Sequence, residues 1–218
     1  MRISVWLPLL GFLAVVDCLS DSHRKVALES HNRYREMLAK GKALNNDQKA
    51  LPKGKNIYKL NYDEEAEKAA QEWADGCVFE HSPKEQRKNA GQSLFAVMPA
   101  EKTPSRPKKA LITATDKWWS ELAEFGLQSP DLNFTMDQFN KGIGHWSQLV
   151  WAKTYRVGCG VKFCADKPMT YVVCNYFPPG NMINSKIYEQ GDACQKDDEC
   201  TTYEASKCEK ETGLCIAK

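Results

Sequence analysis

The sequence lacks a strong net charge, since 30 Lys and Arg residues stand against 28 Asp and Glu residues, for a formal charge of +2 at pH 7. Its basic residues are scattered, and the short basic run at 106–109 follows a proline-rich stretch. A nucleic-acid-binding domain would carry a basic stripe. No internal repeat is visible, and no apolar run after the first twenty residues is long enough to span a bilayer. The pattern argues against a nucleic-acid-binding protein, a repeat protein and an internal transmembrane segment.

The first twenty residues predict a secretory signal peptide. Arg2 supplies the positive start, and Val5–Val16 is an apolar run of about a dozen residues, which is too short to cross a bilayer as an uncleaved anchor. Cys18 and Ser20 are small residues placed three and one before a cut after Ser20. In a secreted, extracellular protein, Asn133 is also an expected glycosylation acceptor, because Phe and Thr follow it.

Cysteine usage agrees with secretion. The sequence has 9 Cys, and none lies in a C-x-x-C pair, which disfavours the alternative of a zinc site built from thiolates. Cys18 leaves with the signal peptide. The others form an even set that predicts four disulfides, each stabilising the fold by roughly 2–4 kcal/mol. These are Cys77, Cys159, Cys164, Cys174, Cys194, Cys200, Cys208 and Cys215.

Hydrophobic periodicity predicts three helices, over 23–40, from an N-cap at Asn61 to about Cys77, and over 109–125. Strands are expected at 91–97, 157–163 and 169–177, and the last two form a hairpin. Residues 42–58 and 126–143 are expected to be loops. This mixture has no regular βαβ alternation, and it predicts an α+β fold, a three-layer α-β-α sandwich with a largely antiparallel sheet.

The chain changes character after Tyr188. Residues 189–218 hold four cysteines and few large apolar side chains, so they cannot build a core of their own. We therefore expect a signal peptide over 1–20, one main domain over 21–188, and a disulfide-rich, hinge-like C-terminal extension over 189–218.

Two segments resemble the paired signatures of the CAP superfamily (SCP/TAPS proteins), which includes cysteine-rich secretory proteins, antigen-five venom allergens and pathogenesis-related proteins. They are GHWSQLVW at 144–151 and YVVCNYFPPGN at 171–181. Further matches are ESHNRYR at 29–35, LNYD at 60–63, the stretch 73–82 and WWSE at 118–121. The resemblance runs from about residue 24 to the end. The tail and the Gly180–Met182 exit look most like the secreted venom-allergen-like, activation-associated proteins of parasitic nematodes.

The resemblance implies the CAP (SCP) fold and a disulfide pattern. It pairs Cys77 with Cys164, and Cys159 with Cys174, a pairing that also follows from the predicted hairpin. In the extension it pairs Cys194 with Cys208 and Cys200 with Cys215, where four cysteines alone allow three pairings.

The resemblance also implies a central cleft with two histidines and two acidic residues. The matching positions are His81, Gln92, Glu121 and His145, and Gln92 stands where the family usually has Glu. Two imidazoles and carboxylates suit a divalent cation such as zinc, and the missing charge predicts weak binding rather than a required cofactor. The alternative is a polar cleft whose side chains bond one another and water.

The candidate nucleophile is poorly placed for catalysis. Ser147 lies two residues from His145, and side chains two apart on a helix do not face each other. A zinc hydrolase needs a general base as well as ligands, and Glu121 would have to be both. We therefore expect no enzymatic activity, with a metal-dependent hydrolase as the weakest alternative. His31, on the apolar face of the first helix, is expected to be a hydrogen-bonded packing residue.

The family resemblance implies lipid binding. Relatives bind sterols at a loop before the histidine turn and fatty acids between two helices, and the matching loop here is 128–142. Its apolar side chains Leu132, Phe134 and Phe139 are the expected sterol contacts, unless they pack into the core. The main alternative is an immune-modulating effector that binds a host receptor and no lipid.

Overall fold

The computed structural model describes residues 19–97 and 106–218. The expected signal segment up to residue 18 lies outside these ranges, as do Pro99 and Pro104 of the proline-rich stretch that precedes the basic run. A four-stranded sheet forms the middle of the molecule, in the order β2 (Asn61–Tyr62), β5 (Arg156–Cys164), β6 (Met169–Phe177) and β3 (Gly91–Val97). β2 runs parallel to β5, and the other two pairings are antiparallel.

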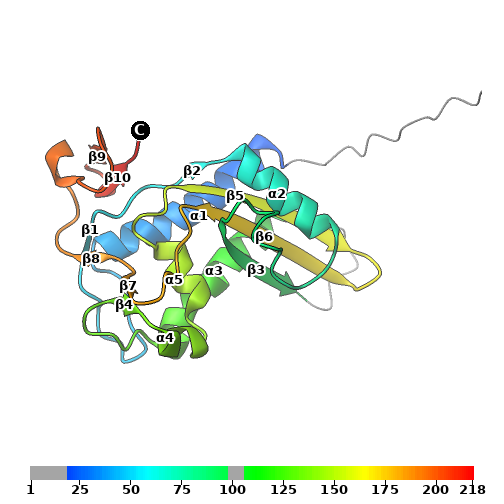
Figure 1. Cartoon of the computed structure of the whole chain (residues 1–218), viewed down its shortest axis with the longest axis horizontal. Coiled ribbons are helices and arrows are strands. Elements are labelled where there is room, and N and C mark those ends of the chain that lie inside the picture. The colour runs from blue at the N-terminus through cyan, green and yellow to red at the C-terminus, as the bar shows by residue number, and fades with distance from the viewer. Residues whose placement is uncertain (1–18, 98–105) are drawn as a thin grey trace, which may run out of the picture.

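Helices cover both faces of this sheet (Figure 1). α2 (Glu64–Asp75) packs against β5 and β6 on one face, and α1 (Asp21–Ala39), α3 (Pro107–Phe125) and α5 (Gly144–Val150) lie on the other. The predicted α+β, three-layer architecture is therefore confirmed. No helix in the described part of the chain is both long enough and apolar enough to cross a membrane.

Two glycines of β5 allow α2 to approach the sheet closely. A Cβ atom on Gly158 would lie 2.2 Å from the backbone nitrogen of Glu67, and one on Gly160 would lie 2.5 Å from Cα of Gln71. The Gln71 side chain bonds both backbone groups of Val161 across the same contact. The fit leaves no room for side chains at 158 and 160, so α2 rests directly on the strand backbone.

Three local predictions were wrong. The expected loop 42–58 contains a short strand, β1 (Gly54–Lys55). Asn61 does not cap α2, because it lies in β2 and pairs with Arg156 of β5. The N-cap is Asp63, whose carboxylate accepts a hydrogen bond from the backbone N–H of Ala66 at 2.9 Å. The segment 126–143 is more than a loop, since it contains β4 (Asn133–Phe134) and α4 (Met136–Asn140). β4 pairs with a strand that comes some fifty residues later along the chain, β7 (Ser185–Lys186), which a local pattern cannot reveal.

A fully buried arginine organises the chain after α5. Arg35 donates hydrogen bonds of 2.7–3.1 Å to five backbone carbonyl oxygens, those of Tyr58, Leu149, Trp151, Ala152 and Thr154. Burial lowers the pKa of its guanidinium to about 9. These bonds fix the turn that leads from α5 into the β5–β6 hairpin.

The four disulfides are those that the family resemblance implies, two within the main domain and two within the extension. The extension is therefore joined to the main domain by noncovalent contacts. Its hairpin is β9 (Lys207–Glu209) with β10 (Leu214–Ile216), and a short helical turn, η1 (Asp197–Glu199), precedes it. Cys215 exchanges backbone hydrogen bonds with Ile57 and Lys59. Leu214 is fully buried in the main core cluster. Before it, β8 (Glu189–Gln190) pairs with β1 (Gly54–Lys55).

Candidate functional site

The first histidine of the site, His145, is held by a carboxylate from a neighbouring helix. Oε2 of Glu121, on α3, accepts the backbone N–H groups of His145 and Trp146 at 2.9 and 2.8 Å. Oε1 of Glu121 lies 2.6 Å from Nδ1 of His145. The imidazole stacks on Trp118, with ring centroids 6.0 Å apart. The carboxylate thus places the proton of the ring on Nδ1 and leaves Nε2 with its lone pair.

The second histidine, His81, is held by an amide in the same way. Oε1 of Gln92 lies 3.0 Å from Nδ1 of His81 and accepts the backbone N–H of Ser82 at 3.0 Å. The amide nitrogen of Gln92 donates to Ser82 Oγ and to Asn175 Oδ1, each at 3.0 Å. These partners fix which end of the amide faces the ring, so His81 also carries its proton on Nδ1.

The charge state of His81 follows from its surroundings. Partial burial lowers the pKa of its imidazole, and the positive charge of Arg87 and the neighbouring His145 lower it further. The hydrogen bond to Gln92 acts in the opposite direction. The net result favours the neutral ring, which is the form that binds a metal ion.

The four predicted cleft residues therefore form two pairs, His81 with Gln92 and His145 with Glu121. In metal sites, a carboxylate or carbonyl that accepts the second ring N–H of a ligating histidine orients it without touching the metal. Gln92 and Glu121 occupy that orienting position. The ligand atoms expected for a metal are thus the two Nε2 atoms, and the expectation that Glu121 and Gln92 serve as ligands has no support in this geometry.

Closer groupings of potential ligands exist elsewhere in the described residues, but they cannot bind a metal through thiolates. They are His31 with Cys159 and Cys174, and Cys194 with Cys200 and Cys215. Every one of these cysteines is in a disulfide. His31 is instead a packing residue, as predicted: its ring is buried, with Nδ1 2.7 Å from the Ala27 carbonyl oxygen and Nε2 2.9 Å from the Tyr176 hydroxyl.

Ser147 makes contacts that do not suit a nucleophile. Its hydroxyl donates to Oδ1 of Asn181 at 2.6 Å and to the carbonyl oxygen of Gly144 at 3.1 Å. It is fully buried. The hydroxyl therefore links α5 to the chain after β6, rather than pairing with His145.

The three predicted lipid contacts differ in their exposure to solvent. Leu132 and Phe134 are 4 % and 0 % exposed and belong to the main core cluster. Phe139, on α4, is 53 % exposed and meets Phe134 edge to face. Only Phe139 is at the surface, so the expected role of Leu132 and Phe134 as direct lipid contacts does not fit their burial. Asn133, between them, is partly exposed, and its amide donates to Asp131.

The sequence reasoning missed Ser82, Trp118 and Asn175 as parts of this site. Asn175 was detectable, because it is the single polar residue in the apolar run from Val172 to Phe177, apart from the Tyr176 hydroxyl. It lies directly opposite Gln92 in the β3–β6 register. A polar side chain in a buried strand usually has a specific partner.

Comparison with known proteins identifies the family. Residues 28–176 match the Cysteine-rich secretory protein family, CAP. The chain belongs to the CAP family. Ancylostoma secreted protein of Ancylostoma caninum is 34% identical over 204 residues, which are 91% of this chain and 45% of that protein. The chain thus spans less than half the length of that relative. Venom allergen 3 of Solenopsis invicta is 31% identical over 175 residues, 78% of this chain and 73% of the allergen.

Solved CAP structures confirm the fold. The structure of NaASP2 with Zn2+ has a TM-score of 0.80 and 37% identity, covering 91% of this chain and 97% of that one. The structure of BmVAL-1 has a TM-score of 0.84 and 34% identity, covering 92% of this chain and 96% of that one. The disulfides, together with relatives named as secreted and venom proteins, agree with an extracellular location.

Proposed function

We propose that this chain is a secreted, non-enzymatic CAP protein that binds a sterol at its surface and acts as a host-interaction effector. The observation that carries the proposal is a set of exposed apolar side chains, here called the α4 surface. It consists of two residues of α4 and two of the segment after β6. They are Met136, Phe139, Met182 and Ile183, exposed by 54%, 53%, 54% and 40%.

The two segments of the α4 surface lie together because several bonds join them. The backbone N–H of Asn184 donates to the Phe134 carbonyl oxygen at 2.7 Å, beside the β4–β7 pairing. A Cβ atom on Gly144 would lie 3.6 Å from the Phe139 ring and 3.9 Å from the Asn181 amide nitrogen. The Phe139 ring and the other three side chains of the α4 surface are therefore carried by two segments that are bonded to each other.

The α4 surface suits a rigid apolar ligand. Phe134, which belongs to the main core cluster with Leu132, meets the Phe139 ring edge to face, so this ring of the surface rests against the core. Covering an apolar side chain contributes roughly 1.5–3 kcal/mol when it is fully removed from water. A fused-ring sterol has few internal rotations to lose, whereas a fatty acid loses many.

The test is competition between labelled and unlabelled cholesterol, with oleate as the comparison ligand. Phe139→Ala and Met182→Ala should each weaken sterol binding by roughly 1–3 kcal/mol if the side chain contacts the ligand. Phe79→Ala is the matched control, since Phe79 is also half exposed, at 50%, and packs on Tyr171 at the other end of the sheet.

Wild-type affinity in both variants would exclude the α4 surface as the sterol site. No sterol binding by the wild-type protein would exclude the carrier function, and the receptor-binding effector would become the better proposal. Phe134→Ala is unsuitable, because removing a fully buried ring costs about 3–5 kcal/mol of stability.

A second proposal concerns zinc. We infer that the cleft binds Zn2+ weakly through Nε2 of His81 and His145. Support comes from the two oriented rings and from the structure of NaASP2 with Zn2+, a relative with 37% identity. Titration calorimetry with zinc tests the proposal, and His145→Ala should abolish the signal. Unchanged heats in that variant would place any bound zinc elsewhere.

A further inference from the structure

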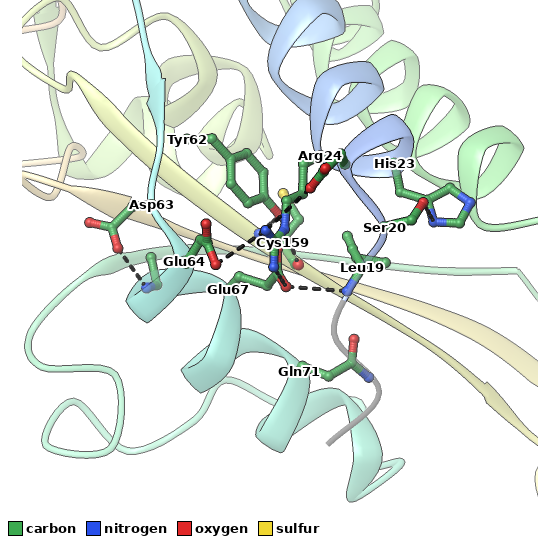
Figure 2. A network of polar contacts seen from close by, with 12 residues as sticks. Leu19, Ser20, His23, Arg24, Tyr62, Asp63, Glu64, Glu67, Gln71 and Cys159 are labelled. Carbon is green, nitrogen blue, oxygen red and sulfur yellow. Dashed lines mark hydrogen bonds and ion pairs between the residues drawn. The ribbon is translucent and has the colours of Figure 1, made fainter. Parts of the chain in front are cut away.

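The backbone nitrogen of Leu19 contacts a buried carboxylate. It donates a hydrogen bond to Oε1 of Glu67, on α2, at 3.2 Å. A dashed line marks this bond in Figure 2. The Glu67 side chain is only 1 % exposed. The Leu19 side chain is 8 % exposed and belongs to the core cluster between the sheet and α1 and α3. The residue at the edge of the predicted signal peptide is therefore an integral part of the folded domain.

The charges around Glu67 are unbalanced. Arg24 is its one cationic partner in the described structure, with Nε 2.9 Å from Oε2 and a terminal nitrogen 3.1 Å from Oε1. The same guanidinium also lies 3.1 Å from Glu64 and 3.6 Å from Asp21. One positive charge thus faces three carboxylates. A second positive charge beside Glu67 would reduce the excess.

We propose that signal peptidase cuts between Cys18 and Leu19, and that the α-ammonium group thereby created forms an ion pair with Glu67. In this step water adds across the Cys18–Leu19 peptide bond. Cys18 leaves with the new carboxylate, while Leu19 keeps the nitrogen, which takes up a proton. Maturation then converts an amide that donates one hydrogen bond into a cation beside the buried carboxylate.

The cut predicted from sequence, after Ser20, would remove contacts that the fold uses. Ser20 is the N-cap of α1, and its carbonyl oxygen accepts the N–H groups of His23 and Arg24 at 2.8 and 3.0 Å. Leu19 would leave its place in the core. A cut after Cys18 keeps both residues. It also leaves a small residue at the cleavage point and removes the one cysteine outside the four disulfides.

The ion pair makes a specific pH prediction. The Leu19 nitrogen contacts Glu67 of α2. The titratable groups around this contact are Arg24, which also contacts Glu64 and Asp21, the Tyr62 hydroxyl, which bonds Glu67, and His23, which bonds Ser20. The carboxylates outnumber the cations, so the folded pKa of the α-ammonium should rise above its ordinary value of about 8. Its stabilisation is present below that value and is lost as pH rises through the folded pKa.

The first experiment is intact mass and N-terminal sequencing of the protein secreted from eukaryotic cells. A mature chain that begins at Leu19 supports the proposal. A chain that begins at Asp21 overturns it. The measurement uses the wild-type chain, so it does not depend on the folding of a variant.

The second experiment measures the ion pair. Proteins are made that begin at Leu19 or at one glycine placed before it, and their melting temperatures are compared at pH 7. The added residue moves the charge away from Glu67 and should lower Tm by about 2–4 °C, with the difference shrinking above pH 9. The glycine should have no such effect in Glu67→Gln. In Glu65→Gln, an exposed neighbour bonded to Lys88, the full effect should remain. An equal loss in the wild type and Glu67→Gln would refute the pairing.

Discussion

Glu121 binds His145 at two points, through the ring nitrogen Nδ1 at 2.6 Å and through the backbone nitrogen at 2.9 Å. The same carboxylate therefore begins α5 and sets the tautomer of the imidazole. This double role explains how a short helix of seven residues presents one ring nitrogen in a defined direction.

Replacing Glu121 by Gln should weaken zinc binding by about 10–100-fold. The amide must use its oxygen for the two backbone N–H groups, so its NH2 faces Nδ1 of His145. The ring then moves its proton to Nε2, which can no longer bind a metal. Calorimetry checks this, with Glu124→Gln as the control on an exposed position of the same helix. Equal affinities for Glu121→Gln and the wild type would contradict the tautomer argument.

Replacing Gln92 by Glu should tighten zinc binding. A carboxylate beside Nδ1 raises the pKa of the His81 imidazole and makes Nε2 a stronger ligand. The new oxygen would face Oδ1 of Asn175, so the Asn175 amide should turn over to donate to it. Calorimetry on both proteins measures the change. If the affinities were equal, His81 would not be a ligand of the metal.

The protein should lose stability as the pH falls from about 6.5 to 4. Burial lowers the pKa of His31 to about 4, assisted by the charge of Arg35, against the hydrogen bond to Ala27. The unfolded chain takes up a proton at His31 near pH 6.5, while the folded chain does so only near pH 4, so unfolding becomes easier between these values. The loss should approach about 3 kcal/mol.

Urea unfolding across this pH range measures the effect. His31→Gln, which does not titrate, should be less stable at pH 7 but should show a flatter dependence on pH. A dependence as steep as that of the wild type would assign the acid sensitivity to other groups.

Replacing Arg35 by Lys should destabilise the fold by roughly 2–4 kcal/mol, because an ammonium has three donors for five buried carbonyl oxygens. Arg33→Lys is the control on the same helix. Arg33 is 57% exposed and pairs with an exposed Asp116, so the free energy of unfolding should change by about 1 kcal/mol or less. Similar losses in both variants, measured by urea unfolding, would show that the carbonyl contacts of Arg35 contribute little.

Local sequence patterns predicted the helices and strands whose apolar residues recur at a regular spacing. β3 and β6 span the predicted residues, and β5 and α3 differ from prediction by one or two residues at their ends. Each has a regular apolar face or an apolar run bounded by turn residues, so the spacing of its apolar residues predicts the type and the ends of the element. The family resemblance supplied His81, Gln92, Glu121 and His145, which spacing alone would not have joined.

Contacts between residues far apart in the sequence determined the features that local patterns did not predict. Leu132 and Phe134 look like excess apolar bulk in a loop, but the pairing of β4 with β7 turns them into the core. The roles of Gln92 and Glu121 depend on which nitrogen of the His81 and His145 rings they contact, and a sequence pattern does not give atomic positions. Nothing near Leu19 in the sequence reveals that its backbone nitrogen contacts Glu67.

The backbone hydrogen bonds of Cys215 with Ile57 and Lys59 connect the two sides of the compositional boundary after Tyr188. The last thirty residues supply Leu214 to the main core and cover the segment that presents the Tyr58 carbonyl oxygen to Arg35. Buried and hydrogen-bonded contacts therefore cross the compositional boundary. Removing the tail from this chain would empty the space that Leu214 fills and leave the Ile57 carbonyl oxygen and the Lys59 N–H without these partners, so the conformation of the segment around residue 58 depends on residues more than 150 positions later.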